Sequence, residues 1–225
     1  FVLLNYQPRY NSVSTIAHEM GHAMHSYLSS QTQTYINADY SIFCAEVAST
    51  TNEILLLEYM LTKASNEQKI YLLNQFLETV RTTVYRQVQF AEFEKRIHEE
   101  ISSGKTLVAS KLEELWLALN QKYYGEALTI DSELGAEWSR IPHFYTPFYV
   151  YKYATGYSAA STFADLILQN KPGAKEKYLN FLASGGSNYS LTLLKDAGVD
   201  LNTPIPVEST LKKFAEKLAE LKKLL

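Results

Sequence analysis

The pattern H-E-x-x-H at residues 18–22 has the residue types and spacing of a metal site. Residues four apart on a helix lie on the same face, because one turn takes about 3.6 residues. His18 and His22 therefore project side by side, and both imidazoles can bind one Zn2+. Glu19 lies about 100° round the helix. Its carboxylate can take a proton from a water that the metal activates, without being a ligand itself.

A catalytic zinc normally has three protein ligands and one open position, so a third ligand is required. The metzincin pattern would place a third histidine at position 28, which is Leu28 here. The other solution is a glutamate on a following helix, and Glu46 lies in the apolar, small-residue run 43–49. An unpaired carboxylate is costly in such a run, and a metal removes that cost. The sequence predicts one Zn2+ held by His18, His22 and Glu46.

Other interpretations of this pattern stay open. The three fixed residues can occur by chance on an amphipathic helix, with no metal role. Di-iron carboxylate bundles use two E-x-x-H motifs. Glu19 and His22 form one such motif, but Glu94 and His98 have the wrong spacing for a second. His98 lies in a charge run and is expected to be a structural surface residue.

Two more residues near the pattern carry expectations. Gly21 costs about 1 kcal/mol relative to alanine inside a helix, which indicates a close approach by a neighbouring helix or a substrate backbone. Glu53 shares a helical face with Glu46. It can hydrogen-bond a ligand histidine from outside the ligand set, or it can be an ordinary solvated glutamate, and the sequence leaves both open.

Four stretches of the sequence form a recognisable set. They are H-E-M-G-H-A-M-H-S-Y (18–27), C-A-E-V-A-S-T-T-N-E (44–53), F-A-E-F-E-K-R-I-H (90–98) and I-P-H-F-Y-T-P-F-Y-V-Y-K-Y-A-T-G (141–156). Together they resemble the thimet oligopeptidase family of zinc peptidases, and more closely its bacterial branch, oligoendopeptidase F. The resemblance implies cleavage of short peptides in a deep channel, within a largely helical fold.

The tyrosine-rich segment 143–157 supplies a second candidate group. Its rings can simply pack in a core, with their hydroxyls paired. Alternatively, some of them stabilise the oxyanion of peptide hydrolysis, where a preorganised donor contributes about 2.7–4 kcal/mol. In the family, a histidine and tyrosines of this segment have that role, which the resemblance places on His143 and Tyr151, then Tyr145. The spacing after His143 is shorter than in thimet oligopeptidase, so the assignment of individual tyrosines stays open.

Hydrophobic periodicity predicts an all-α, multi-helix fold with little or no sheet. The expected helices cover residues 13–29, 42–63, 68–101, 110–124, 147–169, 174–183, 190–198 and 209–225. The long helix is expected to bend near Thr82, and Ser65 to Gln68 has the pattern of a capping box. Residues 1–6 are expected to be buried, residues 29–34 to form a loop, and residues 126–146 to be irregular.

The composition of the chain narrows the classes of protein to which it can belong. The 225 residues are 46% hydrophobic and 20% charged, which suits one globular domain. The net charge of -3 gives no electrostatic case for nucleic acid or an anionic membrane. No apolar run approaches the ~18 residues of a transmembrane helix. The single cysteine, Cys44, cannot form an internal disulfide and favours a reducing, cytoplasmic location.

Only a short lead-in precedes the metal helix, and members of the family carry a larger N-terminal part before this point. The resemblance therefore implies that residues 1–225 are a single C-terminal catalytic domain that lacks this part. The expected function is a zinc metalloendopeptidase that cleaves internal bonds of short oligopeptides. The alternative is a catalytically weak or inactive peptide-binding or structural fragment. Expected partners are an oligopeptide substrate, the missing N-terminal part and, through surface that it would cover, a second copy.

Overall fold

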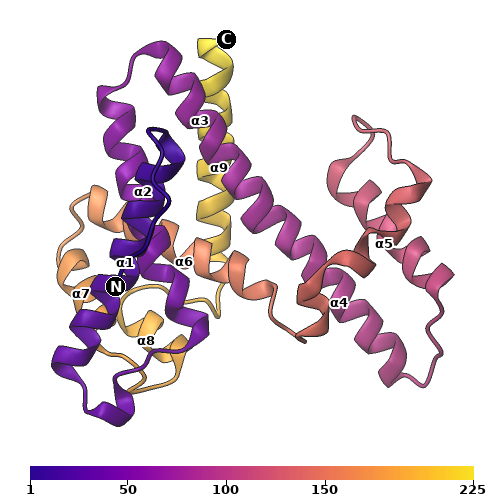
Figure 1. Ribbon diagram of the computed structural model, residues 1–225, viewed down its shortest axis with the longest axis horizontal. Coiled ribbons are helices and arrows are strands. Elements are labelled where there is room, and N and C mark those ends of the chain that lie inside the picture. Colours follow the sequence, from indigo (N-terminus) through magenta and orange to yellow (C-terminus); the bar gives the residue numbers. More distant parts are fainter. The chain divides into compact units, whose positions relative to one another are not determined.

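The computed structural model describes all 225 residues, and its regular structure is entirely helical (Figure 1). The α-helices are α1 (Tyr10–Thr32), α2 (Ile42–Lys63), α3 (Asn66–Val80), α4 (Arg86–Ser102), α5 (Ala109–Tyr124), α6 (Tyr151–Leu168), α7 (Ala174–Ala183), α8 (Ser190–Asp196) and α9 (Ile205–Leu224). Three short stretches are 3-10 helical, η1 (Tyr35–Asn37), η3 (Ser132–Arg140) and η4 (Pro142–Tyr145), and η2 (Arg81–Tyr85) is π-helical. The predicted all-α fold is confirmed. No helix combines the length and the apolar character needed to cross a lipid bilayer.

The chain divides into two compact units. The first unit contains Phe1–Val80 and Thr155–Leu225, and the second contains Arg81–Ala154. The boundary after Val80 coincides with the start of η2, close to the bend predicted near Thr82. A single catalytic domain over residues 1–225 stays a prediction.

In the first unit, α1 and α2 pack closely along each other. The contact depends on Gly21, where an added Cβ would lie 2.5 Å from the Cα of Ser49 and 2.7 Å from the carbonyl oxygen of Ala48. No side chain fits at that distance, so the two backbones approach this closely only because residue 21 is glycine. The close approach predicted at Gly21 is thus an approach to the neighbouring helix.

Helix α9 lies alongside α3 in the first unit (Figure 1). Two of its lysines also form ion pairs with α2 and α6. The Nζ of Lys213 lies 2.5 Å from Oδ1 of Asp165, and the Nζ of Lys217 lies 3.1 Å from Oε2 of Glu58. These four side chains are mostly buried, so the loss of one partner would leave an uncompensated charge. The pairs therefore hold the C-terminal helix in place.

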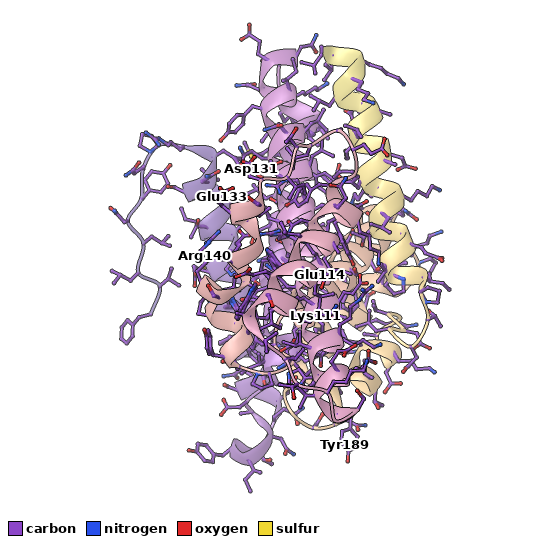
Figure 2. All side chains as sticks on the ribbon, turned by 90° about the vertical axis from the view of Figure 1, so that its right-hand side faces the viewer. Lys111, Glu114, Asp131, Glu133, Arg140 and Tyr189 are labelled. Atoms are coloured by element: carbon purple, nitrogen blue, oxygen red, sulfur yellow. The ribbon has the colours of Figure 1, made fainter.

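The second unit has its own hydrophobic core between α4 and α5. Its buried members are Phe90, Phe93, Trp116, Leu119, Ile141 and Val150. The Arg86 guanidinium lies over the Phe90 ring at 4.7 Å and pairs with Glu137 at 2.5 Å, which neutralises its charge. At the surface, Lys111 and Glu114 of α5 form an exposed ion pair at 3.0 Å (Figure 2). Such an exposed pair contributes little to stability.

Several boundaries differ from the sequence expectations. Helix α1 continues through residues 29–32, which were expected to form a loop, because Ser29 is buried and its hydroxyl donates to the carbonyl of Ala38. Helix α6 begins at Tyr151 rather than at 147, because Phe148 has a φ of 56° and cannot be part of a right-handed helix. The expected burial of residues 1–6 is wrong, since Phe1 and Leu3 are fully exposed.

Other boundaries follow the predictions closely. Helix α2 has the bounds expected for it. The Ser65 capping box is confirmed, because the backbone N–H of Ser65 donates to Oε1 of Gln68 at 2.9 Å and that of Gln68 to the Ser65 hydroxyl at 3.4 Å. These features depend on neighbouring residues alone.

Candidate metal centre

Three predicted ligand groups converge between α1 and α2. Helix α1 supplies His18 and His22, and α2 supplies Glu46 from its first turns. The Nε2 atoms of the two histidines are 3.1 Å apart. Oε2 of Glu46 lies 3.4 Å from Nε2 of His18 and 3.5 Å from Nε2 of His22. The three atoms thus form a nearly equilateral triangle.

The size of this triangle fits a tetrahedral zinc ion. Bonds of about 2.0–2.2 Å to nitrogen and oxygen place neighbouring tetrahedral ligand atoms roughly 3.3–3.6 Å apart. The two imidazole rings meet edge to face, with an angle of 83° between their planes. The rings therefore do not stack, and their Nε2 atoms come together. Two imidazoles and one carboxylate also form a donor set that catalytic zinc sites use, with a fourth position left open.

His18 is held by a residue outside the triangle. Its Nδ1 lies 2.5 Å from Oε1 of Glu53, and this hydrogen bond raises the pKa of His18. A histidine whose Nδ1–H is donated to a carboxylate presents the lone pair of Nε2 outward. Of the two interpretations of Glu53, the structure supports the one in which it pairs with a candidate ligand.

Glu46 is held by Ser49, a buried residue one turn further along α2. The Ser49 hydroxyl donates to Oε2 of Glu46 at 3.0 Å. The side chain of Glu46 is 47% exposed. This carboxylate is therefore not buried at a cost, contrary to the sequence prediction, and the indication for a ligand role is instead its convergence with His18 and His22.

Glu19 lies beside the triangle on α1. It is half-buried, and its negative charge contributes to the raised pKa of His18. No protein hydrogen bond or ion pair occupies its carboxylate. Glu19 can therefore accept a proton without breaking a structural contact.

His25, the third histidine of α1, has a different environment. Its ring is buried and stacks on Tyr40 with centroids 3.6 Å apart, and Phe181 of α7 lies at 5.7 Å. Burial lowers the pKa of His25 to about 4, so the ring is neutral at ordinary pH. His25 thus anchors α1 to the connection before α2 and to α7.

The predicted oxyanion residues all belong to the second unit. Nε2 of His143 lies 3.2 Å from the hydroxyl of Tyr153, and its ring stacks on Tyr149. Tyr145 is 74% exposed and donates to the carbonyl of Ser139, whereas Tyr151 is 39% exposed. The catalytic role of His143, Tyr151 and Tyr145 stays a prediction. The sequence reasoning did not select Tyr153, although its helical spacing from Tyr149 could have indicated a shared face.

A buried carboxylate that the sequence reasoning missed holds this segment. Oε1 of Glu94, on α4, accepts a hydrogen bond from the backbone N–H of Phe148 at 2.7 Å. Phe148 is the residue with the left-handed φ, and the His98 ring lies 4.8 Å from its ring. His98 is half-buried against Phe148 and lies outside the candidate metal cluster, which agrees with the structural role expected for it, although it is less exposed than a solvated face implies. No local pattern marks Glu94, because it lies in a charge run on a helix.

The family model for peptidase family M3 matches residues 1–213. The chain therefore belongs to peptidase family M3, and the resemblance seen in the sequence is confirmed.

Individual relatives support this membership. The chain is 48% identical to oligopeptidase PepF of Bacillus subtilis over 226 residues, covering 100% of this chain and 34% of that protein. It is 44% identical to the chromosomal oligoendopeptidase F of Lactococcus lactis subsp. cremoris, covering 100% and 37%. The crystal structure of oligoendopeptidase-F from Enterococcus faecium superposes with a TM-score of 0.87 at 43% identity, covering 95% and 39%. The chain thus spans about a third of the length of the curated relatives it matches.

Proposed function

We propose that the chain forms the zinc-binding catalytic region of a peptidase that hydrolyses internal peptide bonds of short oligopeptides. The observation that carries the proposal is the triangle of His18, His22 and Glu46, whose edges of 3.1, 3.4 and 3.5 Å fit a tetrahedral zinc ion. Membership in peptidase family M3 and the names of the oligoendopeptidase relatives support the reaction class.

His18, His22 and Glu46 would hold the ion, with Glu53 orienting His18 and Ser49 orienting Glu46. When bound, zinc polarises the scissile carbonyl and lowers the pKa of water toward neutrality. The residues around it must then position the substrate and move protons.

Glu19 is the proposed general base. Its carboxylate has no competing partner, so it can take the proton of the attacking water and pass it to the leaving amine. His143 and Tyr151, then Tyr145, are the proposed donors to the oxyanion of the tetrahedral intermediate. The hydrogen bond between His143 and Tyr153 would orient the imidazole for that role.

The second candidate function is a catalytically weak or inactive peptide-binding or structural region. This candidate rests on the chain spanning about a third of the length of its curated relatives. The parts of such proteins that orient a substrate and exclude water can lie outside the region that this chain matches. Self-association also stays a prediction, which light scattering on the purified chain tests directly.

Zinc content and peptide cleavage, measured on one preparation, test the proposal. We expect about one zinc per chain by mass spectrometry and measurable cleavage of a quenched fluorescent oligopeptide. Glu19→Gln is the matched variant, because it keeps the size of the side chain and the zinc ligands but removes the base. It should keep its zinc while cleavage falls by about 10²–10⁴-fold. Zinc binding without any cleavage supports the second candidate, and a chain that binds no zinc overturns the proposed site.

A further inference from the structure

We infer that Ser14 is a positioning residue for the candidate metal centre, acting on His18 through Glu53. The inference rests on the proposed function, because it concerns how tightly the same three ligands hold zinc. Ser14 lies one turn before His18 on α1 and outside the H-E-x-x-H pattern. It therefore shares the face of α1 that meets α2.

The two oxygens of Glu53 have different partners on α1. Oε1 lies 2.5 Å from Nδ1 of His18, and Oε2 accepts a hydrogen bond from the Ser14 hydroxyl at 3.3 Å. The last torsion of a glutamate is broad and roughly two-fold, so one hydrogen bond leaves the carboxylate plane free to turn. The second bond, from Ser14, removes this freedom and keeps Oε1 directed at His18.

The helix backbones are tied together at the same level. The side-chain amide of Asn52, next to Glu53 on α2, donates to the carbonyl of Ala17 at 3.2 Å. Asn52 therefore contacts the backbone just before His18, and the adjacent Glu53 contacts the His18 ring. Because this bond holds the helices in register, loss of Ser14 should change the carboxylate orientation and leave the helix packing intact.

Ser14 has a single hydroxyl hydrogen, and it donates this hydrogen to Oε2 of Glu53. The neighbouring Tyr10, one turn earlier on the same face of α1, has a pKa raised by burial, so its phenol stays neutral beside Ser14.

The expected effect follows from the place of each residue in the series of hydrogen bonds from Ser14 through Glu53 to His18. Loss of a partner that orients a metal ligand weakens metal binding by about 10–100-fold, which we expect for Glu53→Ala. Ser14 is one step further away and contributes one hydrogen bond to a carboxylate. We therefore expect Ser14→Ala to raise the zinc Kd by roughly 5-fold.

The test is the zinc Kd of the whole chain, measured by competition with a chromogenic chelator. Ser14→Thr keeps the hydroxyl and should stay near the wild-type Kd. Thr15→Ala is the matched control, because the Thr15 hydroxyl bonds only the Asn11 carbonyl of its own helix. It should leave the Kd unchanged.

A double-mutant cycle separates positioning from a general effect on the helix. If Ser14 acts through Glu53, Ser14→Ala should add no further loss in a Glu53→Ala background. An equal loss in both backgrounds overturns the inference, as does a Ser14→Ala chain with the wild-type Kd. Either result leaves the proposed function intact, provided that the wild-type chain binds zinc. A wild-type chain that binds no zinc overturns both.

Discussion

The metal centre and the tyrosine segment differ in how the backbone presents their side chains. His18, His22 and Glu46 project from two long, regular helices that touch backbone to backbone at Gly21. The segment around His143 combines a short 3-10 helix, a left-handed residue and the first turn of α6. Each candidate group lies within its own compact unit.

This difference determines how each group can be disturbed. Helical geometry sets the spacing of the metal ligands, so only a change of ligand or of helix packing should displace them. The tyrosine segment has no regular backbone around Phe148, and its conformation depends on single contacts such as the one with Glu94. The following predictions test each group by its own contacts, from the largest expected effect to the smallest.

The largest effect is expected for Glu46→Ala, which removes one corner of the ligand triangle. Two imidazoles alone hold zinc weakly, so zinc should be lost on dialysis and peptide cleavage with it. Metal analysis together with circular dichroism measures the outcome, and the helical content should stay unchanged. If Glu46→Ala binds zinc as tightly as the wild type, Glu46 is not the third ligand.

The helix contact itself is tested by Gly21→Ala. The added Cβ would lie 2.5 Å from the Cα of Ser49, so the helices must separate. We expect the free energy of unfolding to fall by about 3 kcal/mol and zinc binding to weaken. Gly156→Ala on α6 is the matched control, because its Cβ would meet nothing within 4 Å. It should stabilise the chain by about 0.5–1 kcal/mol, and equal destabilisation by both variants would contradict the packing argument.

In the metal-free chain, the lowered pKa of His25 should make the free energy of unfolding fall as the solution becomes mildly acidic. Its pKa is lowered from 6.5 to about 4, so between these values the unfolded chain takes up a proton that the folded chain does not. The contribution of neutral His25 to the free energy of unfolding is complete above pH 6.5. It declines as the pH falls toward 4, by about 3 kcal/mol in all.

A matched variant isolates the contribution of His25. The raised pKa of His18 acts in the opposite direction, because the folded state binds that proton more tightly and gains stability as the pH falls. His25→Phe keeps a ring against Tyr40 and leaves His18 in place. Denaturant unfolding between pH 7 and 4 should therefore show a smaller loss for His25→Phe than for wild type. Equal losses would exclude His25 as the cause.

The smallest effect is expected for Glu94→Ala in the second unit. The Phe148 N–H loses its acceptor, so we expect a destabilisation of about 1–3 kcal/mol and faster amide exchange in residues 146–150. Glu94→Gln retains an acceptor oxygen for the Phe148 N–H and should destabilise the chain less than Glu94→Ala. Glu94 contacts none of the proposed zinc ligands or their hydrogen-bond partners, so the zinc Kd should stay at its wild-type value in both variants, and a weakened Kd would contradict this expectation.

Much of the metal centre could be predicted from the sequence, because it depends on helical periodicity. The shared face of His18 and His22, the bounds of α2 and the Ser65 capping box all follow from residues within one or two turns of each other. Glu46 is indicated by elimination of Leu28, whereas burial gives no support, because its side chain is 47% exposed.

Only the tertiary structure decided which groups meet across elements. Glu53 lies beside His18 and Ser14 because Gly21 lets α2 approach α1 at that level. Similarly, the pairing of His143 with Tyr153 depends on the chain turning at Phe148, which Glu94 of another helix stabilises. Helix spacing is a local property that the sequence encodes residue by residue. Contacts between helices depend on where two surfaces meet in register, which no local pattern of residues specifies.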